Sequence, residues 1–206
     1  MSETARVAVM EIRTAVYRAC VAEGASSGEA EAAGAAAARA EVLVGGGVRL
    51  ALQALEAIPR ERIGARVEDG EVARLVDPAG RAPLLRIRMA LDWLGATGRA
   101  IAVPDLAWAD ALVGALPPGV AAIGPDRGAA CPDGGVALFD GTGGIDAEPV
   151  HGILLLRAEP TAARARIDRE EADRRLADAG ATGVVVDARD WALLDAAAAR
   201  YLVPEA

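Results

Sequence analysis

Apolar residues recur at helical spacing through residues 1–60. Between Glu3 and Glu23, the positions Val9, Ile12, Val16 and Cys20 fall three or four apart, with Val7 and Val21 beside them, which predicts an amphipathic helix that ends at Gly24. Ser26, with Glu29 three residues later, has the pattern of a capping box and begins a second, Ala-rich helix. Three consecutive glycines end that helix before a third begins. The expected helices span residues 3–23, 26–44 and 48–58.

Beyond residue 60 the pattern changes to short apolar runs separated by turn residues, with helical segments between several of them. The expected strands span residues 71–76, 99–103, 120–123, 136–139, 152–156 and 183–186. The expected helices span residues 84–94, 104–116, 168–179 and 190–202, the last of them capped by Asp190. This alternation predicts an α/β fold with a mixed sheet, preceded by a helical layer. We expect a helical layer at 1–60 and an α/β core at 61–206, together forming one compact unit.

The composition excludes several classes of function. The chain has 206 residues and a formal net charge of −8, which disfavours nucleic acid as a partner because phosphates require a basic face. It contains no lysine, so Schiff-base enzymes, P-loop nucleotide hydrolases and protein kinases are excluded. The only serines are Ser2, Ser26 and Ser27, which lie at the N-terminus or at a helix cap and do not suit a serine hydrolase.

The sequence also suggests where the protein resides. No apolar run reaches the roughly 18 to 20 residues that a membrane helix needs, and the first residues lack a secretory pattern. Two cysteines, Cys20 and Cys131, are too few for a disulfide framework and suit a reducing compartment. We therefore expect a soluble, acidic, cytoplasmic protein that has no membrane contact.

Two residues are the candidates for a catalytic role. Cys131 lies in a turn sequence, Ala-Cys-Pro-Asp-Gly-Gly, where an exposed thiol could act as a nucleophile if a cation stabilised its thiolate. His151 is the single histidine, and histidine alone has an ordinary pKa close to neutrality. A loop cysteine and a hydrogen-bonded residue at a strand edge are the plainer interpretations. With one histidine and two distant cysteines, the sequence predicts no metal site.

Four aspartates are the candidates for ligand binding. Asp105 and Asp187 each follow an apolar run and precede a helix, and ligands of open α/β sheets gather at the carboxyl ends of strands. Helix capping explains the same positions. Asp126 and Asp140 lie in a Gly-rich segment, where carboxylates could bind a cation or simply form turns. Capping and turn formation are the interpretations that we favour.

Two blocks of the sequence resemble an uncharacterised proteobacterial domain-of-unknown-function family. The stretch that begins at Gly24 reads G-x-S-x-G-x-A-E-x-A-G, and the end of the chain, from Trp191 to Pro204, matches the W-x-x-L…Y-x-x-P ending of that family. The two blocks cover roughly a third of the chain. No activity is known for the family, so the resemblance implies a fold neighbourhood and no catalytic residues.

A second resemblance is to the malate/L-lactate dehydrogenase family of NAD(P) enzymes that lack a Rossmann fold. Those enzymes also begin with two helices around a G-x-S motif and then carry Ser-His-Gly before the next helix. Here Gly45, Gly46 and Gly47 occupy that place, so that glycine stands where the catalytic histidine would be. The resemblance implies a shared ancestry in which the hydride-transfer site has been lost.

The sequence leads to two functional hypotheses. The first is a non-catalytic accessory protein that binds a small ligand or a protein partner, with the N-terminal helices as the surface for a partner or a second copy. The second is a small enzyme that uses carboxylates with Cys131 or His151, or a degenerate relative of the NAD(P)-dependent dehydrogenases. The enzyme hypothesis requires at least two of these groups to meet in one pocket. We favour the first hypothesis and expect no bound cofactor.

Overall fold

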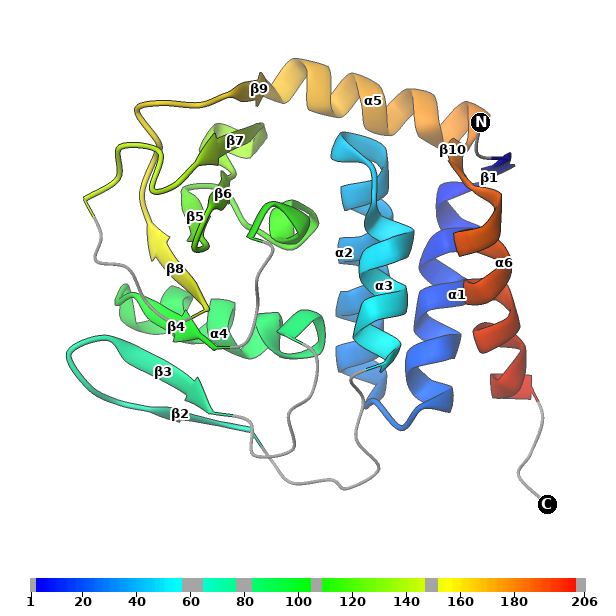
Figure 1. The fold of residues 1–206 in the computed structure, drawn as a ribbon, viewed down its shortest axis with the longest axis horizontal. Coiled ribbons are helices and arrows are strands. Elements are labelled where there is room, and N and C mark those ends of the chain that lie inside the picture. Colours follow the sequence, from blue (N-terminus) through cyan, green and yellow to red (C-terminus); the bar gives the residue numbers. More distant parts are fainter. Residues whose placement is uncertain (1–2, 57–64, 77–82, 105–108, 147–151, 203–206) are drawn as a thin grey trace.

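The Ala-rich helix α2 (Ser27–Val44) lies in the middle of the molecule, between the other N-terminal helices and the β-sheet (Figure 1). The computed structural model describes residues 3–56, 65–76, 83–104, 109–146 and 152–202. The helices that pack against α2 are α1 (Val9–Ala22), α3 (Gly47–Glu56), α4 (Pro83–Thr97) and α5 (Arg169–Thr182). Helix α2 therefore contributes to both the helical part and the sheet part of the fold.

The main sheet has eight strands in the order β2-β3-β4-β8-β5-β6-β7-β9. Strands β3 and β4 run parallel, and every other neighbouring pair is antiparallel. The strands are β2 (Arg66–Glu68), β3 (Ala73–Val76), β4 (Ile101–Val103), β5 (Val120–Ile123), β6 (Arg127–Ala130), β7 (Val136–Asp140), β8 (Ile153–Arg157) and β9 (Ala165–Ile167). The predicted α/β fold with a mixed sheet and an N-terminal helical layer is thus confirmed.

A strand near the N-terminus pairs with a strand that precedes the last helix, in a separate two-stranded sheet on the helical side. Strand β1 (Thr4–Val7) pairs antiparallel with β10 (Val184–Asp187), and helix α6 (Ala188–Ala199) then packs against α1. The expectation of one helix over residues 3–23 is wrong at its start. A four-residue strand has too few positions to separate from a helical pattern, and β1 forms by pairing with residues at the far end of the chain.

Several local expectations also need correction. Helix α6 is capped by Asp187, whose carboxylate accepts hydrogen bonds from the backbone N–H groups of Arg189 and Asp190, and not by Asp190 itself. The helix expected over 104–116 is a 3-10 helix, η1 (Ala109–Gly114), over the described part of that range. Strands β2, β6 and β9 were not expected. The predicted turn at 77–80 and the helix end at Pro59 lie outside the described residues.

The capping box at the start of α2 is confirmed, and it leads into a buried ion pair. Ser26 caps the helix, and the Glu29 carboxylate accepts a hydrogen bond from the backbone N–H of Ser26. The other oxygen of Glu29 pairs with the guanidinium of Arg86 on α4. Only 7% of the Arg86 side chain and 20% of the Glu29 side chain are exposed. This pair joins the helical layer to the sheet side of the fold.

Neighbouring elements approach α2 closely enough to require glycine. A Cβ at Gly47, the first residue of α3, would lie 2.0 Å from the carbonyl oxygen of Ala37. A Cβ at Gly114, at the end of η1, would lie 1.9 Å from the carbonyl oxygen of Ala36. Real Cβ atoms do not make such contacts with backbone. Because the α2 side chains at these contacts are alanines, the backbones of α3 and η1 pack directly against the backbone of α2.

Apolar burial follows this arrangement. One core lies among α1, α2, α3 and α6, and a second lies between α2, α4 and the main sheet. Cys20 is fully buried in the first core, as expected, and burial raises the pKa of its thiol to about 12, with smaller contributions from Glu23 and Glu29. Among the described helices, none is long and apolar enough to cross a membrane.

Candidate functional site

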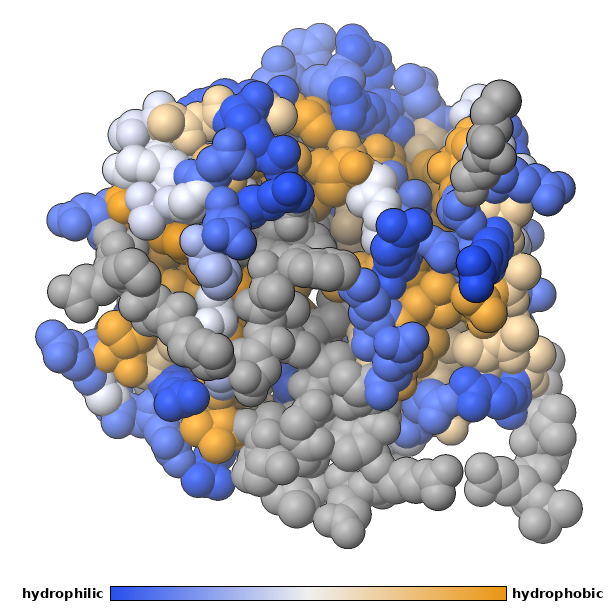
Figure 2. Space-filling view, viewed as in Figure 1, coloured by the Kyte–Doolittle hydropathy of each residue, from blue (hydrophilic) through white to orange (hydrophobic). Residues whose placement is uncertain are grey.

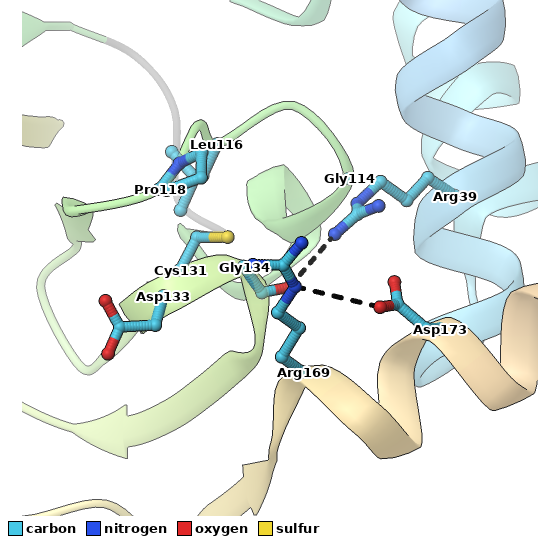
Figure 3. A pocket seen from close by; sticks show the side chains of 9 residues that line it. All are labelled: Arg39, Gly114, Leu116, Pro118, Cys131, Asp133, Gly134, Arg169 and Asp173. Atoms are coloured by element: carbon cyan, nitrogen blue, oxygen red, sulfur yellow. Dashed lines mark hydrogen bonds and ion pairs between the residues drawn. The ribbon is translucent and has the colours of Figure 1, made fainter.

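A pocket of about 750 Å³ lies where α2, α5 and two short turns meet (Figure 3). One turn is η1, and the other is the 3-10 turn η2 (Pro132–Gly134), which joins β6 to β7. The volume is in the range of sites for small molecules. The lining residues are Arg39, Gly114, Leu116, Pro118, Cys131, Asp133, Gly134, Arg169 and Asp173. The pocket therefore combines an apolar wall with charged groups of both signs and one thiol.

Arg39 on α2 is a cation without a carboxylate partner among the described residues. Its side chain is half-buried, and its guanidinium donates a long hydrogen bond of 3.5 Å to the carbonyl oxygen of Gly134. It also donates to the thiol of Cys131. Neither acceptor carries a full negative charge, while a guanidinium taken out of water is stabilised best by an anion. Arg39 can therefore bind an anionic ligand in the pocket.

Arg169 and Asp173 lie one turn apart on α5 and form the outer wall of the pocket. Their Nε–Oδ2 distance is 3.7 Å, and both side chains are well exposed. Such a surface pair is weak, so a ligand can compete for either partner. Figure 3 shows Arg39, Arg169 and Asp173 directed toward the space beside Gly134. One face of the pocket thus offers two guanidinium groups and a carboxylate.

The turn between β6 and β7 places its own residues by an unusual backbone conformation. Asp133 has φ +46°, and it is the one residue other than glycine with a positive φ in the described ranges. Aspartate tolerates this region better than most residues. Two residues later, a Cβ at Gly135 would lie 2.5 Å from the carbonyl oxygen of Ile167. The turn is therefore fixed against the start of α5.

Cys131 lines the pocket, yet its thiol is poorly suited to nucleophilic attack. Only 1% of the residue is exposed. Burial raises the pKa of the Cys131 thiol above its usual value, and the charge of Arg39 with a hydrogen bond from the backbone of Gly134 offsets part of that rise. The thiol is consequently protonated at neutral pH. A catalytic thiolate requires the opposite shift.

A pH profile of thiol modification checks this assignment. The rate constant for the reaction of Cys131 with a chromogenic disulfide reagent is measured as a function of pH. The midpoint of this profile should lie above the ordinary cysteine pKa of about 8.5. The variant Arg39→Gln should move that midpoint further up, because the positive charge that lowers the pKa is removed. The variant Cys131→Ala should leave only the slower reaction of the fully buried Cys20. A rate constant for Cys131 that has already reached its plateau at neutral pH would contradict the assignment of a protonated thiol.

The other predicted site residues that the structure describes lie away from this pocket. Asp126 and Asp140 are exposed at the opposite end of the β6–β7 hairpin, where Asp140 pairs with Arg164 at 3.5 Å. Asp187 caps α6 on the helical side. Asp105 and His151 lie outside the described residues. Within the described ranges, no group of three or more metal-ligating side chains is found.

A second concavity, of about 480 Å³, lies between α3 and α6. Its exposed lining is mostly apolar, and Figure 2 shows hydrophobic surface between hydrophilic residues over the helices. Its arginines are paired: Arg49 with Asp190 at 3.1 Å, and Arg200 with Glu23. Since those charges are already compensated, this concavity has less to offer a charged ligand than the Arg39 pocket.

The pocket residues with the clearest chemistry were not selected from the sequence. In the sequence, Arg39 is one charged residue within an Ala-rich helix, and Arg169 and Asp173 lie in a helix with many charged residues, so nothing local marks them as a site. They come from segments about 130 residues apart, which meet only in the fold. Cys131 was selected for its residue type.

Several solved structures with a similar fold are named as dehydrogenases or a reductase. No family model matches the chain, and no curated relative matches it. The comparisons therefore give no support to the domain-of-unknown-function family. The fold agrees with the weaker resemblance to malate/L-lactate dehydrogenases, although identities near ten per cent establish the fold alone.

Three solved structures illustrate the similarity. A dehydrogenase from Sinorhizobium meliloti has a TM-score of 0.63 at 12% identity, covering 95% of this chain and 100% of that chain. Malate dehydrogenase from Pyrococcus horikoshii OT3 has a TM-score of 0.60 at 11% identity, covering 100% and 99%. Delta1-piperideine-2-carboxylate reductase from Pseudomonas syringae pvar. tomato has a TM-score of 0.57 at 12% identity, covering 94% and 99%.

The three consecutive glycines where α3 begins include left-handed positions and a tightly packed one. Gly46 has φ +79°, a left-handed conformation that a histidine side chain would rarely adopt. Gly47 packs directly on the backbone of α2. The local backbone thus suits glycine at the place where the resemblance puts a catalytic histidine.

Proposed function

We propose that the protein binds a small carboxylate-bearing metabolite in the Arg39 pocket and does not transfer hydride. The observation that carries the proposal is the half-buried Arg39 guanidinium, which faces a pocket and has no carboxylate partner in the part of the chain that the structure describes. A guanidinium offers paired N–H donors that match the two oxygens of a carboxylate.

The fold neighbours support a carboxylate in particular. Two of the three solved structures described above are named for small carboxylic acids, malate and piperideine-2-carboxylate. A pocket with one half-buried guanidinium, a second guanidinium at its mouth and the apolar residue Leu116 suits compounds of that size. In this proposal the chain shares with those neighbours the binding of a small carboxylic acid, and not their particular substrates.

Two observations favour binding over catalysis. Glycine occupies the place that the resemblance assigns to the hydride-transfer histidine, and the Gly46 backbone is left-handed there. The thiol in the pocket is held protonated by its burial. The enzyme hypothesis required carboxylates to meet Cys131 or His151 in one pocket, and Asp133 and Asp173 do line this pocket together with Cys131. Binding is favoured because the thiol beside these carboxylates is buried and its pKa is raised.

Titration calorimetry with a panel of small carboxylic acids tests the proposal. The variant Arg39→Gln should weaken binding by about ten- to hundredfold, because a charge-assisted hydrogen bond contributes roughly 1.5 to 3 kcal/mol. Arg88→Gln is the matched control, since Arg88 forms an exposed pair with Asp92 outside the pocket. Unchanged affinity in Arg39→Gln would contradict the proposed site.

A second assay addresses catalysis. The protein is incubated with a reduced nicotinamide nucleotide and 2-oxo acids, and the absorbance of the nucleotide is followed. We expect no turnover above that of a buffer blank. Turnover that is lost in Arg39→Gln would show that the chain is an enzyme.

A further inference from the structure

The charges around the pocket balance, and this restricts the ligand beyond its carboxylate. Arg39 and Arg169 supply two positive charges, and Asp133 and Asp173 supply two negative ones. The chain as a whole carries a net charge of −8, so its field repels a ligand with two negative charges. A dicarboxylate is therefore a poor match for this site.

We propose that the ligand is an α-amino acid with an apolar side chain, bound as its zwitterion. This inference rests on the proposed function, because it uses the same pocket and assigns the carboxylate of the ligand to Arg39. The ammonium group is assigned to Asp173, which makes Asp173 a specificity-determining residue.

The exposed pair on α5 is complementary to a zwitterion. Arg169 and Asp173 are 3.7 Å apart, and a ligand that carries both charges can engage both of them at once. A simple carboxylate that draws Arg169 toward itself leaves the charge of Asp173 uncompensated and close to its own. The zwitterion avoids that repulsion, since its ammonium lies one carbon away from its carboxylate.

The carbonyl oxygen of Gly134 supplies a second acceptor for the ammonium group. In the described part of the chain its hydrogen bond is the 3.5 Å contact from Arg39, at the long limit for such bonds. An ammonium has three N–H donors and can use this oxygen together with the Asp173 carboxylate. When Arg39 turns to the carboxylate of the ligand, the carbonyl is left for the ammonium.

The apolar wall determines what kind of side chain the amino acid carries. Leu116 is almost fully buried beside the pocket, and Pro118 lies next to it in the lining. Figure 3 shows both residues on the side of the pocket away from Asp173. An aliphatic side chain placed there buries apolar surface and needs no polar partner.

Matched ligands test the inference by titration calorimetry on the full chain. L-leucine is compared with isocaproate, which lacks only the amino group, and with isoamylamine, which lacks only the carboxylate; L-valine is compared with isovalerate in the same way. We expect each amino acid to bind at least about tenfold more tightly than its deaminated acid, and the amine to bind more weakly than either.

Substitutions separate this inference from the proposed function. Asp173→Asn should abolish the tenfold preference and leave affinity for the deaminated acids unchanged or higher. Asp178→Asn in the same helix is the control and should keep the preference, because Asp178 is exposed and lies outside the pocket lining. A deaminated acid that binds as tightly as its amino acid would overturn the zwitterion and leave carboxylate binding intact. Binding of neither class would overturn both.

Discussion

Replacing Gly47 with alanine is expected to leave the protein unfolded or destabilised by about 4 kcal/mol or more, the largest effect of any single methyl group that we predict. The added Cβ would lie 2.0 Å from the carbonyl oxygen of Ala37 and 2.7 Å from the backbone nitrogen of Glu41. Both atoms belong to the backbone of α2, so no side-chain rotation relieves the overlap. Helix α3 would have to move away from α2, which would open the helical core.

Gly95→Ala in α4 is the matched control. A Cβ at Gly95 meets nothing within 4 Å, and the position is helical, so alanine should be neutral or stabilise by about 0.5 to 1 kcal/mol. Urea denaturation followed by circular dichroism measures both variants. If the free energy of unfolding of Gly47→Ala lies within about 1 kcal/mol of that of the unmodified protein, α3 does not pack as closely on α2 as described.

Substituting Glu29 with glutamine should destabilise the protein by about 2 to 3 kcal/mol. The change keeps the shape of the side chain and removes the negative charge that faces Arg86, whose side chain is 7% exposed. Losing one partner of a buried ion pair usually costs 3 to 5 kcal/mol, and the 20% exposure of Glu29 reduces that figure. The ion pair joins α2 to α4, so its loss also loosens the contact between the helical layer and the sheet.

Glu31→Gln in the same helix provides the comparison. Glu31 pairs with Arg13 at 3.0 Å, and the two side chains are 67% and 42% exposed. Exposed pairs of this kind contribute between about 0 and 1 kcal/mol. Thermal and urea unfolding of the two variants should therefore separate them clearly. Equal effects would mean that the Glu29–Arg86 pair is hydrated in solution.

The sequence was informative wherever structure depends on neighbouring residues. The Ser26–Glu29 capping box, the Ala-rich helix after it and the glycines that end it are local signals, and the structure confirms them. The strand expected at 120–123 is β5, an uninterrupted apolar run. These elements follow from periodicity and capping, which need no knowledge of the fold.

The elements that the sequence did not reveal depend on distant partners. Strand β1 forms by pairing with β10 at the other end of the chain, and β6 (Arg127–Ala130) has only small residues and one arginine to signal a strand. The pocket is of the same kind. Arg39 looks like an ordinary helix residue until the fold places it beside Cys131 and Gly134. Residue type can suggest Cys131, but only the tertiary structure shows that its thiol is buried and its pKa raised.

In the proposed complex, the Arg39 guanidinium receives the carboxylate of a small metabolite. A crystal structure of the protein soaked with L-leucine tests it most directly. We expect ligand density between α2 and α5, with the carboxylate within hydrogen-bonding distance of Arg39. Ligand bound only between α3 and α6, or in the pocket with its carboxylate away from Arg39, would rule out Arg39 as the carboxylate-binding residue.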